Sequence, residues 1–218
     1  MRATGPGLDG IRYSFWAIAL QYAAELFCLL AVFLPDIIQD LPFFNDSTMR
    51  FLPKKVVSNE KEIYQKPSET RPLNLKNSDN KILSSLLNCQ LAPVVAAKAH
   101  IAQRGFVVSR HFLSNIILAD ACARAISSAR IFGAFACLCA FDLASAFPSI
   151  AHSFLFATLS AARLPCGVIA LVRALYHRCR VVSRSAQPHF MYFMILSGVL
   201  QGCPLSATLF VIAMNPFF

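Results

Sequence analysis

Residues 133–150, GAFACLCAFDLASAFPSI, decide the predicted fold. The first nine of them, 133–141, form a short uninterrupted run of small, aromatic and aliphatic residues, which is typical of a strand buried on both faces. Such a strand delivers Asp142 at its C-terminal end. Asp142 is the only carboxylate in residues 131–218, so it is either a cap of the following turn or a functional group.

The segments that follow this strand alternate between helix and strand. The pattern predicts, in order, a helix over 150–163 capped by Ser149, a helix over 166–178, paired strands at 179–184 and 190–196, and an apolar helix near the C-terminus. Gly198, Gly202 and Pro204 mark a tight connection before that last helix. Alternation of this kind, without an internal repeat, predicts an α+β fold.

Upstream, two further helices are predicted. Ser78 or Asp79 is expected to be the N-cap of the first, and Pro93 to bend or end it. Ser109 is expected to cap the second, whose apolar residues recur at helical spacing. The polar residues 40–76 between the N-terminal region and these helices read as loops and short strands.

Residues 14–34, SFWAIALQYAAELFCLLAVFL, are apolar for 21 positions and are followed by Pro35. The length suits a membrane span, but a carboxylate such as Glu25 near the centre of a span costs about 2.5–3.5 kcal/mol. A buried helix is therefore the favoured interpretation, and a small membrane protein anchored by 14–34 is the alternative.

The net charge of +9 is concentrated in the middle of the chain, because residues 51–130 carry +7. Clustered Lys and Arg favour a polyanionic partner, although a solvated basic surface would give the same composition. The eight cysteines are scattered through mostly apolar runs, which favours a reducing, intracellular compartment, cytoplasmic or nuclear, over a disulfide scaffold or a zinc site.

Two motifs some fifty residues apart carry a resemblance to a known family. FDLASAFPSI at 141–150 and SGVLQGCPLSATLF at 197–210 resemble the reverse transcriptase family, in the branch found in non-LTR retrotransposons and group II introns. The first is similar to that family's aspartate-bearing palm strand and the second to its Gln-Gly-x-Pro-Leu-Ser motif. Further resemblances occur in the family's order, at 3–11, 49–55, 71–87 and 103–116.

The resemblance implies the fingers and part of the palm of a right-hand polymerase, with an incomplete palm sheet and packed helices. Residues 1–130 would then hold an N-terminal segment and a fingers-like region, and residues 131–218 a partial palm. The implied activity is RNA-directed DNA polymerisation. The implied partners are an RNA template, a DNA primer and deoxynucleoside triphosphates, with no membrane expected.

The resemblance also implies roles for individual residues. Asp142 and the carbonyl of Leu143 match ligands of two Mg²⁺ ions, whose hard charge prefers oxygen donors. The other matched positions would contact the nucleotide. The N–H groups of Ser145 and Ala146 and the guanidinium of Arg71 would bind the triphosphate, and Lys54 or Lys55 would add a positive charge. Phe147 would lie at the sugar, and Gln201 with Gly202 would lie against the base and the template. For Phe147 an ordinary core position, and for Gln201 an ordinary polar loop position, remain alternatives.

The sequence departs from the family in one respect. The Tyr-x-Asp-Asp hairpin that supplies the family's remaining metal-binding carboxylates has no counterpart in 131–218, and we expect it to follow Phe218 in the family's order. The expected identity is therefore a fragment of a reverse transcriptase domain, inactive by itself. The alternative within the same fold is a nucleic-acid-binding remnant that does not polymerise.

Overall fold

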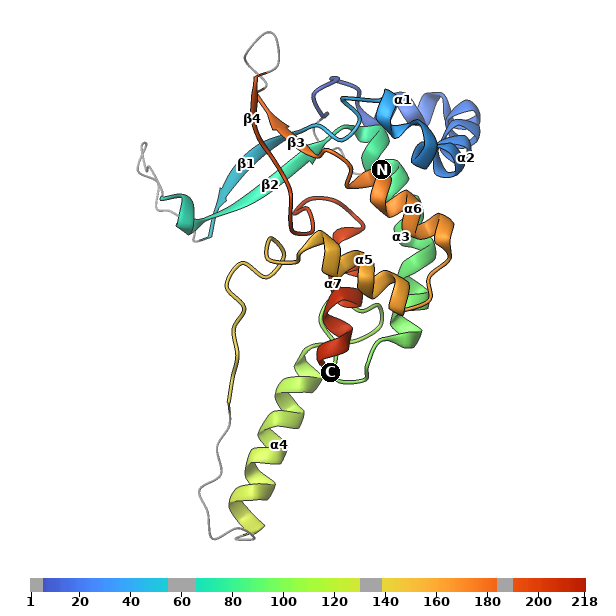
Figure 1. Cartoon of the computed structure of the whole chain (residues 1–218). Helices are drawn as coiled ribbons and strands as arrows, with labels where there is room; N and C mark the ends of the chain where they lie inside the picture. The colour runs from blue at the N-terminus through green and yellow to red at the C-terminus, as the bar shows by residue number, and fades with distance from the viewer. Residues whose placement is uncertain (1–5, 55–65, 130–138, 184–189) are drawn as a thin grey trace.

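The computed structural model of the protein describes residues 6–54, 66–129, 139–183 and 190–218, in which the helices gather on one side of a small mixed sheet (Figure 1). The helices are α1 (Tyr13–Ile18), α2 (Leu20–Ile37), α3 (Ser78–Lys98), α4 (Leu113–Ala129), α5 (His152–Ala161), α6 (Cys166–Leu175) and α7 (Ser206–Met214). The strands are β1 (Ser47–Pro53), β2 (Thr70–Lys76), β3 (Arg180–Val182) and β4 (Met191–Met194). This mixture of helices and one sheet confirms the expected α+β class.

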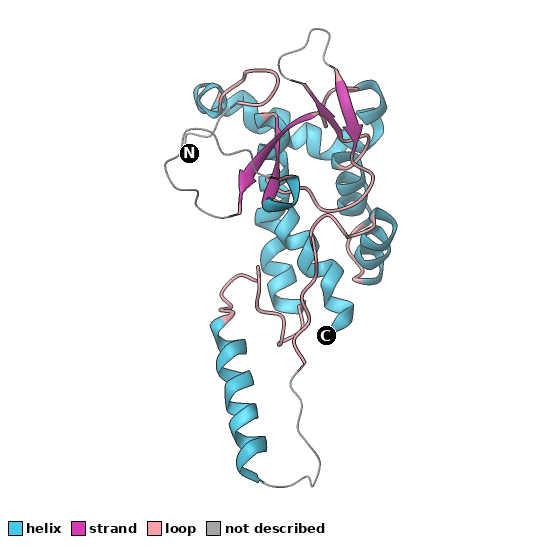
Figure 2. Ribbon diagram, turned by 90° about the vertical axis from the view of Figure 1, so that its left-hand side faces the viewer, coloured by secondary structure: helices cyan, strands magenta, loops and turns pink. Residues whose placement is uncertain are grey.

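The four strands have the order β2-β1-β3-β4 (Figure 2). β1 and β2 form an antiparallel hairpin that is paired along its whole length, from Ser47 opposite Lys76 to Pro53 opposite Thr70. β1 meets β3 in parallel at Ser47 and Val181, and β3 pairs with β4 in the antiparallel sense. One sheet therefore joins residues 47–76 to residues 180–194.

The hydrophobic core lies beneath this sheet, among the helices. α5 packs against α6 and α7, and α7 also packs against α3. Leu83, Leu155, Leu159, Leu205 and Leu209 are at most 1% exposed, so each contributes a fully buried side chain to this core. The expected helices at 150–163 and 166–178 and the helix near the C-terminus are confirmed as α5, α6 and α7. The expected cap of α5 is wrong, because its N-cap is Ala151 and the hydroxyl of Ser149 donates to the carbonyl of Ser145 instead.

The apolar N-terminal stretch forms α1 and α2, and Pro35 does not end α2, which continues to Ile37. The expectation of a buried helix is wrong for most of its surface. Of α2 itself, the fully buried residues are Ala23, Phe27 and Leu34, on the side that packs against α3 and α6. Within the described ranges, Leu20–Asp40 is the one stretch long and apolar enough to cross a membrane, a test that core helices also pass.

α3 has a different N-cap from the one expected, and Pro93 does not end it. Its N-cap is Asn77, whose side-chain oxygen accepts a hydrogen bond from the N–H of Leu8 at 2.8 Å and does not cap the helix. Pro93 lies inside the helix, which continues to Lys98 because Leu91 and Val95 on either side of the proline are buried in the core.

The predicted cap of α4 is wrong as well. Ser109 has a left-handed backbone, with φ of +63°, and the helix begins four residues later at Leu113. α4 extends away from the other helices (Figure 1), and its side chains are exposed as far as they are described, including Ile116, Ile117 and Leu118 at 55–61%.

The strand expected at 133–141 falls mainly on residues outside the described ranges. Of this strand, residues 139–141 are described, and they are irregular rather than extended into a strand, so the expectation is wrong for this part. The strand pair expected at 179–184 and 190–196 is confirmed in shorter form by β3 and β4.

Asp79 in the first turn of α3 makes the stability of the fold depend on pH. Burial, aided by the nearby charge of Asp9, raises the pKa of the Asp79 carboxyl above 3.8, and the hydrogen bond from the N–H of Asn80 at 2.6 Å offsets only part of this. The unfolded chain then releases this proton at lower pH than the folded chain does. Stability therefore falls as the pH rises from 3.8 through the folded pKa.

We expect Asp79→Asn to stabilise the protein at pH 7, because asparagine keeps an oxygen for the N–H of Asn80 and carries no charge. The gain should disappear below pH 3.8, where the aspartate is protonated in both states. Urea unfolding midpoints of both proteins at pH 7 and pH 3 check this. A variant no more stable than the parent at pH 7 would contradict it.

Candidate functional site

The connection between β4 and α7 joins two of the segments singled out in the sequence. The N–H of Gly198 donates a hydrogen bond of 2.6 Å to the carbonyl of Ile150, and the N–H of Val199 donates one of 2.9 Å to the carbonyl of Phe147. An isolated antiparallel bridge between Ala151 and Ser197 continues this pairing. Residues 147–151 and 197–199 thus lie side by side, although about fifty residues separate them in the chain.

Gly198 is required for this close approach. Its φ is +86°, a left-handed conformation that residues with a side chain rarely adopt. A Cβ atom at this position would lie 2.6 Å from the Cα and 2.8 Å from the carbonyl oxygen of Pro148. The backbone of the 147–151 segment therefore occupies the space that any side chain at 198 would need.

The next turn of the same connection, Gln201–Gly202, is docked on β2. The N–H of Asn74 donates a hydrogen bond of 2.7 Å to the carbonyl of Gln201. Gly202 has a φ of +104°, and a Cβ there would lie 2.6 Å from the carbonyl oxygen of Asn74 and 2.9 Å from Cδ1 of Leu73. The 197–202 connection consequently holds β2 on one side and the 147–151 segment on the other.

Residues 144–149 form a turn that presents two of the predicted backbone donors. Ser145 has a left-handed φ of +54°, and its carbonyl accepts hydrogen bonds from the N–H and the hydroxyl of Ser149 at 3.1 and 2.9 Å. The N–H groups of Ser145 and Ala146 donate no hydrogen bond to any other described residue. Exposed backbone donors of this kind are suited to an anion.

Phe147, at the end of this turn, is half-buried in a cluster of three rings. Its ring centroid lies 4.7 Å from that of Phe210 on α7 and 5.6 Å from that of Phe106. Phe106 and Phe210 are themselves 6.3 Å apart. These contacts fit the core alternative for Phe147, and they also hold the position of its ring beside the turn.

Arg71 lies on β2, on the same face of the strand as Leu73, because side chains alternate along a strand. It is exposed, and no hydrogen bond or ion pair joins its guanidinium to another described residue. Leu73 touches the position where Gly202 would carry a Cβ, so Arg71 lies two residues, about 7 Å, along the strand from the Gln201–Gly202 turn.

The two predicted lysines differ from Arg71. The Nζ of Lys54 donates a hydrogen bond of 2.7 Å to the carbonyl of Ser68, so its charge is engaged at the end of the β1–β2 hairpin. Lys55 lies outside the described residues.

Arg50 is a functional candidate that the sequence did not single out. It is exposed on β1 opposite Leu73, and its side chain therefore shares the face that carries Arg71. Only the register of the hairpin reveals this pair of cations, since 20 residues of chain separate them.

Asp142 and Leu143 lie on the irregular segment that leads into the turn. Both are exposed, and Phe141 beside them is 93% exposed. Phe147 lies five positions after Asp142 in the chain, so the two Cα atoms are at most about 18 Å apart. In the ranges given above, no cluster of three or more His, Cys, Asp or Glu side chains could hold a metal ion. Asp142 therefore does not form a two-metal site with other described carboxylates.

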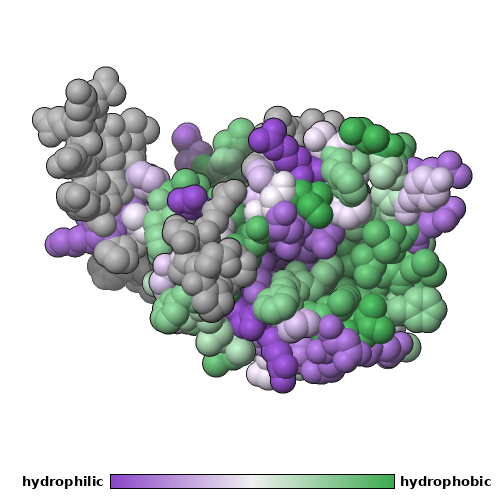
Figure 3. Space-filling view, turned by 90° about the horizontal axis from the view of Figure 1, so that it is seen from above, coloured by the Kyte–Doolittle hydropathy of each residue, from purple (hydrophilic) through white to green (hydrophobic). Residues whose placement is uncertain are grey.

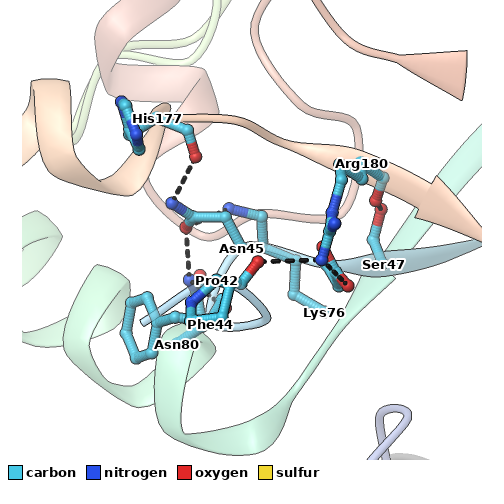
Figure 4. Close-up of polar contacts among 9 residues, drawn as sticks. Pro42, Phe44, Asn45, Ser47, Lys76, Asn80, His177 and Arg180 are labelled. Atoms are coloured by element: carbon cyan, nitrogen blue, oxygen red, sulfur yellow. Dashed lines mark hydrogen bonds and ion pairs between the residues drawn. The ribbon is translucent and has the colours of Figure 1, made fainter. Parts of the chain in front are cut away.

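A buried polar junction fixes the base of the β1–β2 hairpin (Figure 4), and nothing in the sequence pattern had indicated it. The Nζ of Lys76, which is 3% exposed, donates hydrogen bonds to the side-chain oxygen of Asn45 at 3.2 Å and to the carbonyl of Leu175 at 3.0 Å. Asn45 in turn donates to the carbonyls of Ala174 and His177, both at 2.7 Å. The junction thus ties β2 to the C-terminal end of α6.

The same junction contains an ion pair. The guanidinium of Arg180 at the start of β3 donates to both carboxylate oxygens of Asp46 at 2.8 Å and to the carbonyl of Pro42 at 2.8 Å. Asp46 is almost fully buried, with its side chain 4% exposed. Because Asp46 immediately precedes β1, this pair holds β1 and β3 together where they meet.

Comparison with known proteins gives a family match over most of the chain. Residues 52–218 match the sequence model of the family described as reverse transcriptase (RNA-dependent DNA polymerase). The chain is also similar to the transposon TX1 uncharacterized 149 kDa protein of Xenopus laevis, with 26% identity over 147 residues. That alignment covers 67% of this chain and 11% of the Xenopus protein, so the chain spans a small part of that relative's length.

Proposed function

The chain belongs to the reverse transcriptase family, and on this basis we propose that the segments joined by the 197–202 connection form the nucleotide-binding part of a polymerase active site. The observation that carries the proposal is the double docking of this connection, on the 147–151 segment and on β2. It groups the motifs that the family resemblance associates with the incoming deoxynucleoside triphosphate.

The charges around the connection support a phosphate-binding role. Arg71 and Arg50 share one face of the β1–β2 hairpin, and the N–H groups of Ser145 and Ala146 are available on the neighbouring turn. A guanidinium fork matches the geometry of phosphate oxygens, and backbone N–H groups bind the same ligand without a mobile side chain. In this proposal, Arg71 and the turn hold the triphosphate, and Gln201 and Gly202 lie against the base and the template.

Phe147 is proposed to limit the space at the sugar. Its contacts with Phe106 and Phe210 support this role, because they restrict the movement of the ring. A ring held in this way would exclude the 2′-hydroxyl of a ribonucleotide by its bulk. The right-hand architecture, with 1–130 as the fingers-like region and 131–218 as part of the palm, belongs to the same proposal.

The proposed partners are an RNA template and a DNA primer. The positive charge of the chain supports both, since each phosphate contact releases counterions. The similarity to a transposon protein supports an element of the non-LTR type as the source of this domain.

The metal chemistry of the family is not supplied by these residues. Asp142 and the carbonyl of Leu143 offer oxygen donors of the kind that Mg²⁺ prefers, but one carboxylate cannot balance two divalent cations. Residues 131–218 contain no other carboxylate. The proposal is therefore limited to nucleotide and template binding by this chain.

We expect the 218-residue polypeptide to incorporate no nucleotide in a primer-extension assay with template RNA and Mg²⁺. The reason is the single carboxylate, since nucleotidyl transfer depends on two metal ions held by several carboxylates. Extension products that disappear in an Asp142→Asn variant would contradict this expectation.

Binding of a deoxynucleoside triphosphate tests the proposed site. Arg71→Ala is expected to weaken the affinity of the polypeptide for Mg²⁺-dATP by about tenfold or more, because a charge-assisted hydrogen bond to phosphate is lost. Arg163→Ala removes an exposed arginine from the α5–α6 loop, far from the hairpin, and should leave the affinity unchanged. Equal losses in the two variants would indicate non-specific attraction and would refute the proposal.

A further inference from the structure

The outer face of α2 carries an exposed apolar stripe. Tyr22, Leu26, Leu29 and Phe33 are 42–75% exposed, and they recur at helical spacing on one side of the helix. The space-filling view in Figure 3 shows hydrophobic side chains gathered on the side of the molecule where α1 and α2 lie. A helix with a single apolar face buries that face against the rest of its own chain and needs no further partner. α2, in contrast, is apolar on both its inner and its outer face.

The charges around this stripe argue against a membrane surface. No Lys or Arg lies between Arg12 and Arg50, whereas helices that lie on anionic membranes are rich in these residues. Glu25 is exposed next to the stripe, Asp36 is exposed in the last turn of α2, and Asp40 is exposed three residues beyond its end. These carboxylates would be repelled by anionic headgroups.

The spacing of the stripe is the same when it is read from either end. The steps between Tyr22, Leu26, Leu29 and Phe33 are four, three and four residues. If two copies of α2 pack antiparallel about a twofold axis midway between Leu26 and Leu29, each Tyr22 faces the Phe33 of the other copy, and each Leu26 faces the other Leu29. A twofold interface requires this self-complementarity.

The charges at the ends of α2 match the same arrangement. The first turn of α2 contains no acidic residue, and the last turn contains no basic one. An antiparallel pair would place Asp36 of each copy near the N-terminal turn of the other, where the helix dipole favours a negative charge.

We propose that the stripe on α2, formed by Tyr22, Leu26, Leu29 and Phe33, is a homodimer interface in which two copies of this chain pack through antiparallel α2 helices. The interface lies apart from the 197–202 connection and the β1–β2 hairpin. It is thus independent of the proposed nucleotide site and gives a dimer with two such sites.

Disulfide trapping tests the direction of packing. Chains carrying Tyr22→Cys are mixed with chains carrying Phe33→Cys, oxidised mildly at low micromolar concentration, and mapped by peptide mass spectrometry. The expected product joins position 22 of one chain to position 33 of the other. In a dimer of two identical variants, the two introduced thiols would be about 16 Å apart along the helix axes and should not react. A predominant 22–22 or 33–33 product would overturn the antiparallel arrangement.

Charge substitutions test whether the stripe drives the association. In sedimentation equilibrium, Leu29→Glu is expected to weaken dimerisation at least about tenfold. Two matched controls should leave it unchanged: Ala24→Glu, exposed on α2 away from the stripe, and Ile117→Glu, exposed on α4. Dissociation by Ile117→Glu but not by Leu29→Glu would assign the association to α4 and overturn the proposal, as would a parent protein that is monomeric throughout.

Discussion

Gly202→Ala is expected to lower the free energy of unfolding by about 2–4 kcal/mol, because it combines backbone strain with overpacking. The alanine would have to keep a φ of +104° with its Cβ 2.6 Å from the carbonyl oxygen of Asn74. Neither β2 nor the turn can yield alone, since the hydrogen bond from Asn74 to Gln201 joins them. Urea unfolding of the variant and the parent at pH 7 gives the difference.

Gly167→Ala is the matched control for this prediction. Gly167 lies in the first turn of α6, and nothing lies within 4 Å of the position where a Cβ would be added. The substitution should be neutral or stabilise the protein by up to about 1 kcal/mol, as for glycine to alanine in a helix. If Gly202→Ala cost no more than this control, the docking of the turn on β2 would be incorrect.

Arg180→Ala is expected to destabilise the protein by about 3–5 kcal/mol, the usual cost of leaving a buried charge without its partner. Asp46 would remain almost fully buried after the guanidinium that bonds both its oxygens had been removed. The carbonyl of Pro42 would lose its donor too. The measurement is again the free energy of unfolding in urea.

An exposed ion pair on α4 provides the comparison. Arg124 bonds Asp120 at 2.8 Å, but their side chains are 79% and 60% exposed. Arg124→Ala should therefore cost less than about 0.5 kcal/mol. In the double variant Arg180→Ala/Asp46→Ala, much of the loss caused by the single substitution should be recovered, because no buried charge is left. A double variant as unstable as the sum of the two single ones would show that the pair does not act as a unit.

The sequence predicted those parts of the fold whose cause is local. The sequence pattern of residues 150–218 predicted α5, α6 and α7, and the glycines at 198 and 202 marked the tight connection that the structure shows. The motif strings led to the reverse transcriptase family, which the match over residues 52–218 confirms. In each case a short stretch of chain contains the physical reason.

Features that depend on distant contacts were missed. Arg50 and Arg71 share one face of the hairpin because of its register, which single residues do not specify. Besides the hydrogen bond between Lys76 and Asn45, the junction of Asn45, Lys76 and Arg180 uses partners 99–138 residues away, several of them backbone carbonyls that leave no trace in the sequence. Pro93 does not end α3 for a related reason: Leu91 and Val95 on either side of it are packed in the core, and the helix continues to Lys98.

The roles of the individual site residues come from the family resemblance and stay predictions. These residues are Lys54, Lys55, Arg71, Asp142, Leu143, Ser145, Ala146, Phe147, Gln201 and Gly202. For Asp142, the strand expected to hold it is not formed over 139–143. Its position relative to the Gln201–Gly202 turn therefore rests on the 147–151 segment, which the 197–199 residues hold in place.

Photo-crosslinking with an azido-substituted deoxynucleoside triphosphate tests the central claim most directly. Irradiation of the polypeptide with this nucleotide and Mg²⁺, followed by peptide mass spectrometry, locates the bound ligand. The account predicts adducts within 144–150, 197–202 and the β1–β2 hairpin, which excess dATP suppresses. Adducts confined to α4 or the outer face of α2, or spread evenly and unaffected by dATP, would contradict it.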